Sequence, residues 1–322
     1  MIRTRPQLHC ELCGCPGKPL YTGLADRLFG ASGEWNLSEC SNPACGLMWL
    51  NPMPSEEDIG LAYLNYYTHD PRRTPLFERM LAWFLYTSLG LLAERRRADL
   101  MYLDRISPGR LLEVGFGDGR RLERLSAMGW TVEGQEVDPV AIRQARDRGL
   151  TTHQGALETI GLPGDCYDAV IANHVIEHIH DPVGLLAECR RLLKPGGRLI
   201  LVTPNSNSYG HALFRESWLP LDPPRHLHLF STATMIALLR RAGFRDPLIW
   251  TTMARAGTVF RGSHDLKLRQ AHSVTAFPRV GTALLELKSL LMARIEQFRR
   301  SDAGEELVAC AVKLHPGAIS QA

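Results

Sequence analysis

Four cysteines near the start of the chain are spaced as metal ligands. Cys10 and Cys13 form one pair, and Cys40 and Cys45 form a second pair in the same segment. Thiolates two to four residues apart can bind one ion, and two such pairs complete a tetrahedral zinc site. Four sulfur ligands leave no open coordination position, so the predicted zinc is structural. The alternative is a set of reduced cysteines without a metal, with Cys15 as a spare thiol.

A second group of residues could bind a nucleotide-type ligand. The apolar run 111–114 predicts a buried strand, which is followed by Gly115, Gly117 and Gly119 and then by a helical pattern. Glycines let the backbone approach a ligand closely, and a helix N-terminus offers unpaired N–H groups. A dinucleotide fingerprint would place its third glycine at Arg120, so the spacing departs from that motif.

An acidic side chain follows the glycine turn at the distance expected for a ribose ligand. The stretch 131–136 predicts the next strand and ends in Glu136, about 20 residues beyond the turn. Asp138 competes for this role. The helical pattern that begins at Pro139 leaves Glu136 nearer the strand end.

The elements that must position these residues alternate between strands and helices. This alternation predicts an α/β fold with a mostly parallel sheet and helices on both faces. A long helix over 76–106 and a second apolar helix over 280–298 are also expected, the latter packing through Leu284, Leu287 and Leu291. Further strands are expected over 151–154, 167–172, 198–203, 247–252 and 307–314.

Proline-rich connections and the cysteine pairs suggest three parts of the chain. We expect a small zinc-ribbon-like domain over 1–50, a helical linker region over 51–107, and the α/β domain over 108–322. A proline-rich substrate loop is expected at 205–230, beyond the fifth strand. Ligands of open α/β sheets bind at the carboxyl ends of the strands, and this loop leaves from that edge.

Residues 111–205 resemble the class I S-adenosylmethionine (SAM) methyltransferases over their whole length. The resemblance implies a Rossmann-like, seven-stranded sheet whose last strand is antiparallel at the sheet edge. The cysteine pairs ahead of such a domain resemble a subset that includes sugar C-methyltransferases. The matching pieces, in order, are Glu113 to Gly119, Gly134 to Glu136, Tyr167–Asp168, Val175 to His178, Asp181–Pro182 and Leu192 to Gly197.

The resemblance also implies contacts with SAM. The glycines would wrap its methionine end, Glu136 would hold the ribose, two residues would flank the adenine, and one would lie beside the sulfonium. Many relatives place an acid at 154–157 to bind the adenine amino group, and this chain does not. The implied cofactor-binding residues are Glu113, Gly115, Gly117, Gly119, Glu136, Ala156, Leu157 and Asn173.

Three histidines are candidate bases for methyl transfer. A hydroxyl or acidic C–H acceptor needs a base near neutral pH, where histidine titrates. His226 ranks first because Asp222, in the same loop, could orient it, and His178 ranks second. His174 lies in the same segment as His178, and a core or capping role is the alternative for each of the three.

These observations predict a SAM-dependent methyltransferase acting on oxygen or carbon of a small-molecule acceptor, such as a sugar or a natural-product intermediate. An RNA methyltransferase that grips RNA through the zinc ribbon is the alternative, although the net charge of +3 argues against it. A non-catalytic module that only retains the fold is a third reading. An apolar, then arginine-rich stretch over 76–97 could contact a membrane surface. Because no signal peptide and no apolar run of about 20 residues is visible, we expect a cytoplasmic protein.

Overall fold

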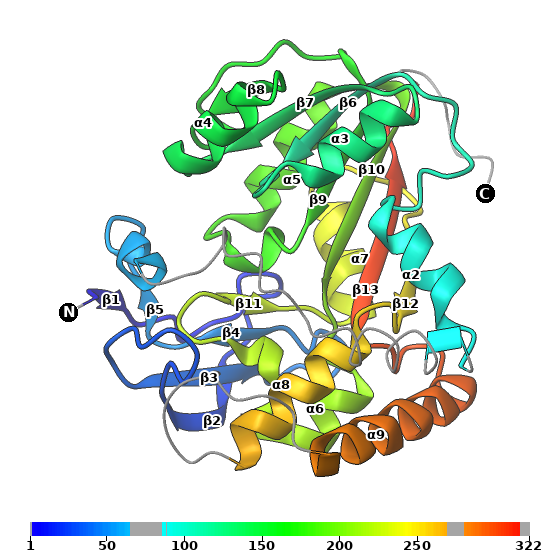
Figure 1. The fold of residues 1–322 in the computed structure, drawn as a ribbon. Helices are drawn as coiled ribbons and strands as arrows, with labels where there is room; N and C mark the ends of the chain where they lie inside the picture. The colour runs from blue at the N-terminus through cyan, green and yellow to red at the C-terminus, as the bar shows by residue number, and fades with distance from the viewer. Residues whose placement is uncertain (1, 65–85, 88, 269–279, 316–322) are drawn as a thin grey trace.

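The computed structural model describes residues 2–64, 86–87, 89–268 and 280–315, without the side chains of 280–284 (Figure 1). Residues 76–85 and 88 of the predicted helix over 76–106, and the tyrosines at 66 and 67, lie outside these ranges. In the described part, α2 (Leu91–Asp99) ends before the predicted boundary, and residues 100–106 form turns. The apolar residues of α2 face inward, with Leu91 and Ala98 buried.

The predicted seven-stranded sheet is confirmed. Its strand order is β12-β13-β10-β9-β6-β7-β8, and strands β6 to β10 are parallel to one another. The C-terminal ends of the parallel strands therefore meet at one edge. The strands are β6 (Arg110–Val114), β7 (Thr131–Glu136), β8 (Thr151–Gln154), β9 (Tyr167–Asn173), β10 (Leu193–Pro204), β12 (Leu248–Thr252) and β13 (Glu306–Val312).

The place of the last strand differs from the prediction. β13 is antiparallel, as expected, but it lies between β10 and β12 rather than at the edge. Leu307, Val308 and Ala309 are buried in succession, so both faces of this strand need cover. Such a strand is accommodated inside a sheet, whereas the more exposed β12 is tolerated at the rim.

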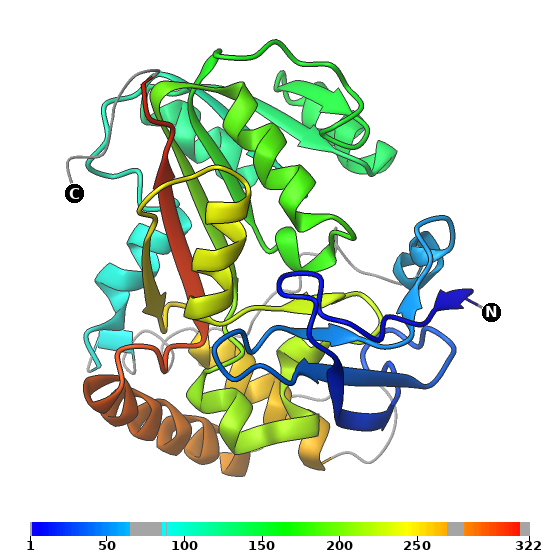
Figure 2. The ribbon, with the colours of Figure 1, turned by 180° about the vertical axis from the view of Figure 1, so that it is seen from behind.

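Helices cover both faces of the sheet, as Figures 1 and 2 show. One face packs against α5 (Pro182–Leu192) and α7 (Thr232–Arg241), and the other against α3 (Arg120–Ala127) and α4 (Pro139–Asp147). Side chains fix where these helices begin. Asp138 caps α4 by accepting a hydrogen bond from Val140 N, and Asp181 caps α5 through Gly184 N.

A smaller antiparallel sheet combines distant parts of the chain. Its order is β11-β4-β3-β2, with β2 (Gly17–Leu24), β3 (Trp35–Cys40) and β4 (Met48–Leu50) from the N-terminal segment. The fourth strand, β11 (His228–Leu229), comes from the loop after β10. Two short strands, β1 (Thr4–Arg5) and β5 (Met53–Pro54), pair beside it, and η1 (Ile59–Tyr63) follows.

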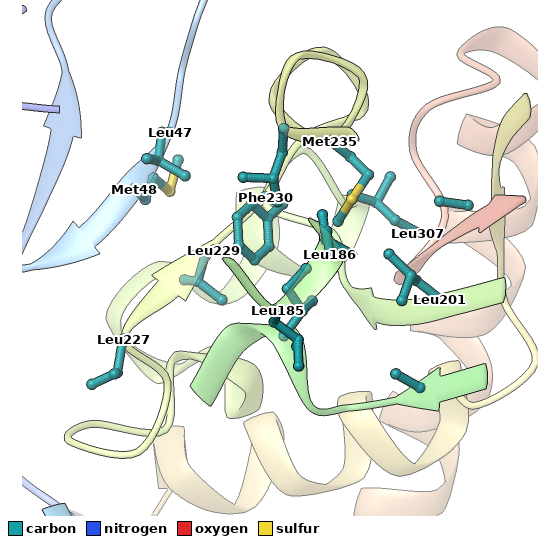
Figure 3. Close-up of a cluster of buried hydrophobic side chains, with 14 of the residues drawn as sticks. Leu47, Met48, Leu185, Leu186, Leu201, Leu227, Leu229, Phe230, Met235 and Leu307 are labelled. Carbon is teal, nitrogen blue, oxygen red and sulfur yellow. The ribbon is translucent and has the colours of Figure 1, made fainter. Parts of the chain in front are cut away.

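One hydrophobic core runs from the small sheet to the large one. Figure 3 shows Leu47 and Phe230 of the small-sheet region facing Leu186 of α5 and Met235 of α7, with Leu201 of β10 beyond them. The loop after β10 adds β11 to the small sheet, and its Phe230 forms a bridge with Asn205, which directly follows β10. The core and this loop therefore hold the N-terminal segment against the strand ends.

The remaining described helices are the α-helices α6 (Tyr209–Phe214), α8 (Ala256–Leu268) and α9 (Val280–Arg299) and the short 3-10 helices η3 (Arg215–Ser217) and η4 (Leu219–Leu221). The predicted helix over 280–298 is confirmed, but its packing face is not. Leu287 and Leu291 are exposed, whereas Leu290 and Ala293 are buried against the protein. Leu284 lies outside the described side chains. Among the described residues, none of the helices combines the length and apolar character that crossing a bilayer requires.

Candidate active site and cysteine cluster

The glycine turn follows β6 at the centre of the sheet, where it lies beside the end of β7. Gly115 N donates a hydrogen bond to the carbonyl oxygen of Gln135 at 2.8 Å. A Cβ at Gly115 would lie 2.6 Å from Val175, so only glycine fits this close approach. Gly117 has a φ of +59°, and a Cβ there would meet open space. The turn therefore exposes backbone toward open space in front of α3.

Glu136 lies directly against this turn. Its Oε2 accepts a hydrogen bond from Gly117 N at 3.0 Å, and its Oε1 accepts one from Val137 N at 2.7 Å. The competing acid, Asp138, caps α4 instead. The carboxylate of Glu136 thus stands at the end of β7, where its remaining lone pairs can accept from ribose hydroxyls.

Glu113 is a buried carboxyl two residues ahead of the turn. Its Oε1 pairs with the Arg121 guanidinium at 2.5 Å, whereas its Oε2 has no hydrogen-bond partner among the described residues. Burial raises the pKa of Glu113 to about 7, against the opposing effect of Arg121. An unpaired buried oxygen beside an open glycine turn fits a polar cofactor such as SAM.

The residues expected at the adenine and sulfonium ends lie at the ends of β8 and β9, which flank β6 and β7 in the sheet. Leu157 is buried and Ala156 exposed in the connection after β8. Gly155 O in that connection accepts a hydrogen bond from the Gln135 side chain at 2.5 Å, which ties it to β7. Asn173 is the last residue of β9, next to β6 in the sheet.

His174 is held between two buried carboxylates. Its Nδ1 lies 3.0 Å from Glu177 Oε1, and its Nε2 lies 2.8 Å from Glu306 Oε1. Burial alone would lower its pKa, but the hydrogen bonds to Glu177 and Glu306 raise the pKa of His174 to about 9. His174 is therefore an imidazolium at neutral pH and cannot act as a base.

His178 and His226 are oriented by backbone carbonyls. His226 Nδ1 lies 2.7 Å from Pro220 O, and His178 Nδ1 lies 3.0 Å from Arg225 O. A carbonyl only accepts, so each Nδ1 carries the proton and each Nε2 offers a lone pair. The two rings pack at 4.6 Å between centroids, and Tyr63 OH lies 3.0 Å from His178 Nδ1.

The surroundings of His178 make it a poor base. Burial, followed by the charge of His226, lowers the pKa of His178 to about 4, so His178 retains a proton poorly at neutral pH. His178, His226 and Glu177 each offer a ligand atom within 4.8 Å of the others. These side chains converge because Leu227 N donates to Glu177 O at 2.7 Å, which ties the loop to η2 (Ile176–His178).

Asp222 does not orient His226 as predicted. The Asp222 carboxylate lies 4.0 Å from His226 Nε2, beyond hydrogen-bond distance, and instead accepts from Arg225 Nε at 3.0 Å. Arg225 is fully buried and also binds Asp26 of the N-terminal segment at 2.7 Å. The carboxylate is thus needed to neutralise Arg225, and Pro220 O takes the orienting role.

The four predicted cysteine ligands converge at one end of the small sheet. Their sulfur atoms all lie within 4.8 Å of one another, with Cys10 Sγ 3.6 Å from Cys45 Sγ and Cys13 Sγ 3.3 Å from Cys40 Sγ. Cys15 is not part of this group. Burial raises the pKa of the Cys10 thiol and raises that of Cys45 to about 11, so thiolates at these positions require a bound cation. The donor set fits zinc.

Comparisons with known proteins agree with this geometry. Residues 91–246 match the family described as Methyltransferase domain. This stretch of the chain is therefore similar to a methyltransferase domain. The ubiquinone biosynthesis O-methyltransferase of Cereibacter sphaeroides is 34% identical over 163 residues, which cover 47% of this chain and 64% of that protein. Its counterpart from Roseobacter denitrificans is 32% identical over 151 residues, covering 43% and 60%.

Among solved structures, a SAM-dependent methyltransferase from Archaeoglobus fulgidus aligns with a TM-score of 0.46 and 20% identity, covering 70% of this chain and 94% of that chain. The aligned stretch spans less than two thirds of the length of the two O-methyltransferases. The cysteine cluster precedes the part of the methyltransferase domain that the family match covers.

Three buried charged residues near the candidate site were given no individual role from the sequence. Glu177 stands inside a quoted motif, Arg225 lies in the proline-rich loop, and Glu306 opens the apolar strand β13. Only Glu306 had a sequence signal of a buried partner, because an acid at the start of an apolar strand is unusual without one. Nothing in the sequence paired Arg225 with Asp26.

Proposed function

We propose that this protein transfers a methyl group from SAM to an oxygen, or to an acidic carbon, of a small-molecule acceptor such as a sugar or a natural-product intermediate. SAM supplies the electrophilic methyl group when it is bound. The glycine turn with Glu113 and Glu136 would hold it, with Ala156, Leu157 and Asn173 beside its adenine and sulfonium ends. The names of the two O-methyltransferase relatives favour oxygen as the acceptor atom.

The orientation of His226 carries the catalytic part of this proposal. With Nδ1 donating to Pro220 O, His226 Nε2 takes the acceptor proton as the acceptor attacks the methyl group. His178 packs against this ring, and burial lowers the pKa of His178 to about 4, which makes it a poor base at neutral pH. Asp222 supports the loop through Arg225 rather than through the imidazole.

The loop at 205–230 contributes the acceptor side of the site. His226 and Asp222 are buried in it, and Leu227 ties it to η2 beside the end of β9. Zinc bound by Cys10, Cys13, Cys40 and Cys45 would be structural, because it stabilises the small sheet to which this loop adds β11. The loop that carries His226 is thereby held by η2 through Leu227 and by the small sheet through β11.

The acceptor can be identified by mass spectrometry. The purified protein is incubated with methyl-labelled SAM and a small-molecule extract, and labelled products are sought. Label on a hydroxyl oxygen or a carbon of a small molecule is the expected result. Label appearing only in RNA would overturn the proposed acceptor class.

The base is tested by substitution. His226→Ala should lower turnover by about 10²–10⁴-fold and leave SAM affinity unchanged, because the base acts only in the transition state. His264→Ala, in α8 and away from the glycine turn, is the matched control and should retain turnover. Full turnover in His226→Ala together with loss in His178→Ala would assign the proton transfer to His178.

A further inference from the structure

The outward face of α9 is apolar. Leu287, Leu291, Met292, Ile295 and Phe298 are all exposed, Phe298 by 82% and Leu291 by 47%. At about 100° per residue these positions fall on one side of the helix. In Figures 1 and 2, α9 lies along the outer edge of the molecule, at the end away from α3 and α4.

This apolar face is not required for packing. The opposite face of α9 is buried through Ser289, Leu290 and Ala293, and Glu286 on the same side pairs with Arg261 of α8 at 3.0 Å. A surface helix usually presents polar residues to solvent. A contiguous exposed apolar stripe therefore indicates an interaction surface.

The charges on this face have one sign. Lys288 and Arg299 lie between the apolar residues, are exposed, and form no ion pair among the described residues. Glu286 is buried with Arg261, and Glu296 is half-buried toward the packed side. No acidic side chain of the described part of α9 therefore lies on the outward face.

We propose that α9 (Val280–Arg299) binds the surface of an anionic phospholipid bilayer, with its apolar stripe in the interface and Lys288 and Arg299 on the lipid headgroups. A helix with an apolar stripe flanked by cations is suited to lie in the plane of such a surface. A second copy of this face is disfavoured, because the same cations would meet one another across a symmetric contact. This inference is independent of methyl transfer.

Vesicle sedimentation of the whole protein tests this inference. Vesicles of about three parts phosphatidylcholine to one part phosphatidylglycerol should bind it, and added salt should weaken the binding. Leu291→Gln combined with Phe298→Gln should lower vesicle binding by at least about tenfold, because interfacial apolar area is lost. Lys288→Gln and Arg299→Gln should each cost about fivefold, and only on anionic vesicles.

The matched control is Leu248→Gln. Leu248 is similarly apolar and 65% exposed, but lies in β12. This variant should bind vesicles as the unaltered protein does, and SAM affinity reports that all the variants are folded. Failure of the unaltered protein to bind anionic vesicles would overturn the proposal. So would a dimer in light scattering that only the Leu291→Gln, Phe298→Gln variant abolishes, because the stripe would then be a self-contact.

Discussion

At the scale of single residues, hydrogen bonds decide which histidine can accept a proton. His174 has a carboxylate at each ring nitrogen and holds its proton, whereas His226 has a carbonyl at Nδ1 and offers a lone pair at Nε2. His174 and His178 come from one short stretch, and His226 comes from the loop after β10. Because their hydrogen-bond partners differ, His174 has a structural role and His226 a chemical one.

The charge on His174 makes a prediction for stability. The folded-state pKa of about 9 lies above the ordinary histidine value of about 6.5. Its stabilisation is therefore complete below about pH 6.5 and is lost as pH rises through about 9. Urea unfolding from pH 6 to 10 should show a falling free energy of unfolding, and His174→Gln should flatten this fall.

His264→Gln is the control, because burial lowers the pKa of His264, so removing this side chain should leave the slope of stability with pH unchanged above about pH 6.5. If His174→Gln and the unaltered protein lose stability with the same slope, the imidazolium is not the titrating group.

At the scale of elements, the segment between α6 and α7 links the two sheets. It contributes η4, the base candidate His226 and strand β11 within a short length of chain. Arg225 fixes it to the N-terminal segment through Asp26 and to its own turn through Asp222. The position of His226 therefore depends on an ion network as well as on Pro220 O.

Removing Arg225 should show how much this network stabilises the fold. Arg225→Met leaves two buried carboxylates without a cation, which should lower the free energy of unfolding by about 3–5 kcal/mol in urea denaturation. Arg300→Met removes an exposed partner of Asp302 and should cost only about 0–1 kcal/mol. An equally small loss for Arg225→Met would show that Asp26 and Asp222 are adequately solvated without it.

The strands were predictable because their signals are local. β7 and β8 begin and end where the alternating and apolar patterns place them, and the glycine turn follows β6 as expected. The position of β13 inside the sheet, the inner face of α9 and the Asp222–Arg225 pair were not predicted. Each depends on a partner far away in sequence: β12 for β13, Arg261 for Glu286, and Asp26 for Arg225.

At the scale of the whole molecule, the small sheet beside the cysteine cluster and the α/β domain form one packed unit. The small sheet is closed by β11, and its core continues into α5 and α7 (Figure 3). So small a sheet has little core of its own, and a bound metal would supply part of its stability. Loss of the metal should therefore loosen the small sheet and displace His226, because the loop that carries His226 also supplies β11.

Elemental analysis should find about one zinc per chain. Cys13→Ser should lose the metal, increase hydrogen exchange in β2 to β4 before the large sheet, and lower turnover. Cys15→Ser is the matched control, since Cys15 stands outside the four-sulfur group, and it should keep the metal. A metal-free protein that remains fully folded and active would contradict the structural role.

The most direct test of the whole account is calorimetry of SAM binding. One SAM should bind per chain, and Glu136→Gln should weaken binding by about 1.5–3 kcal/mol through loss of a charged hydrogen-bond acceptor at the ribose. Asp138→Asn, which retains a capping side chain for α4, should bind SAM with nearly unchanged affinity. Absence of SAM binding, or NADH binding as tight as SAM binding, would contradict the proposed cofactor site.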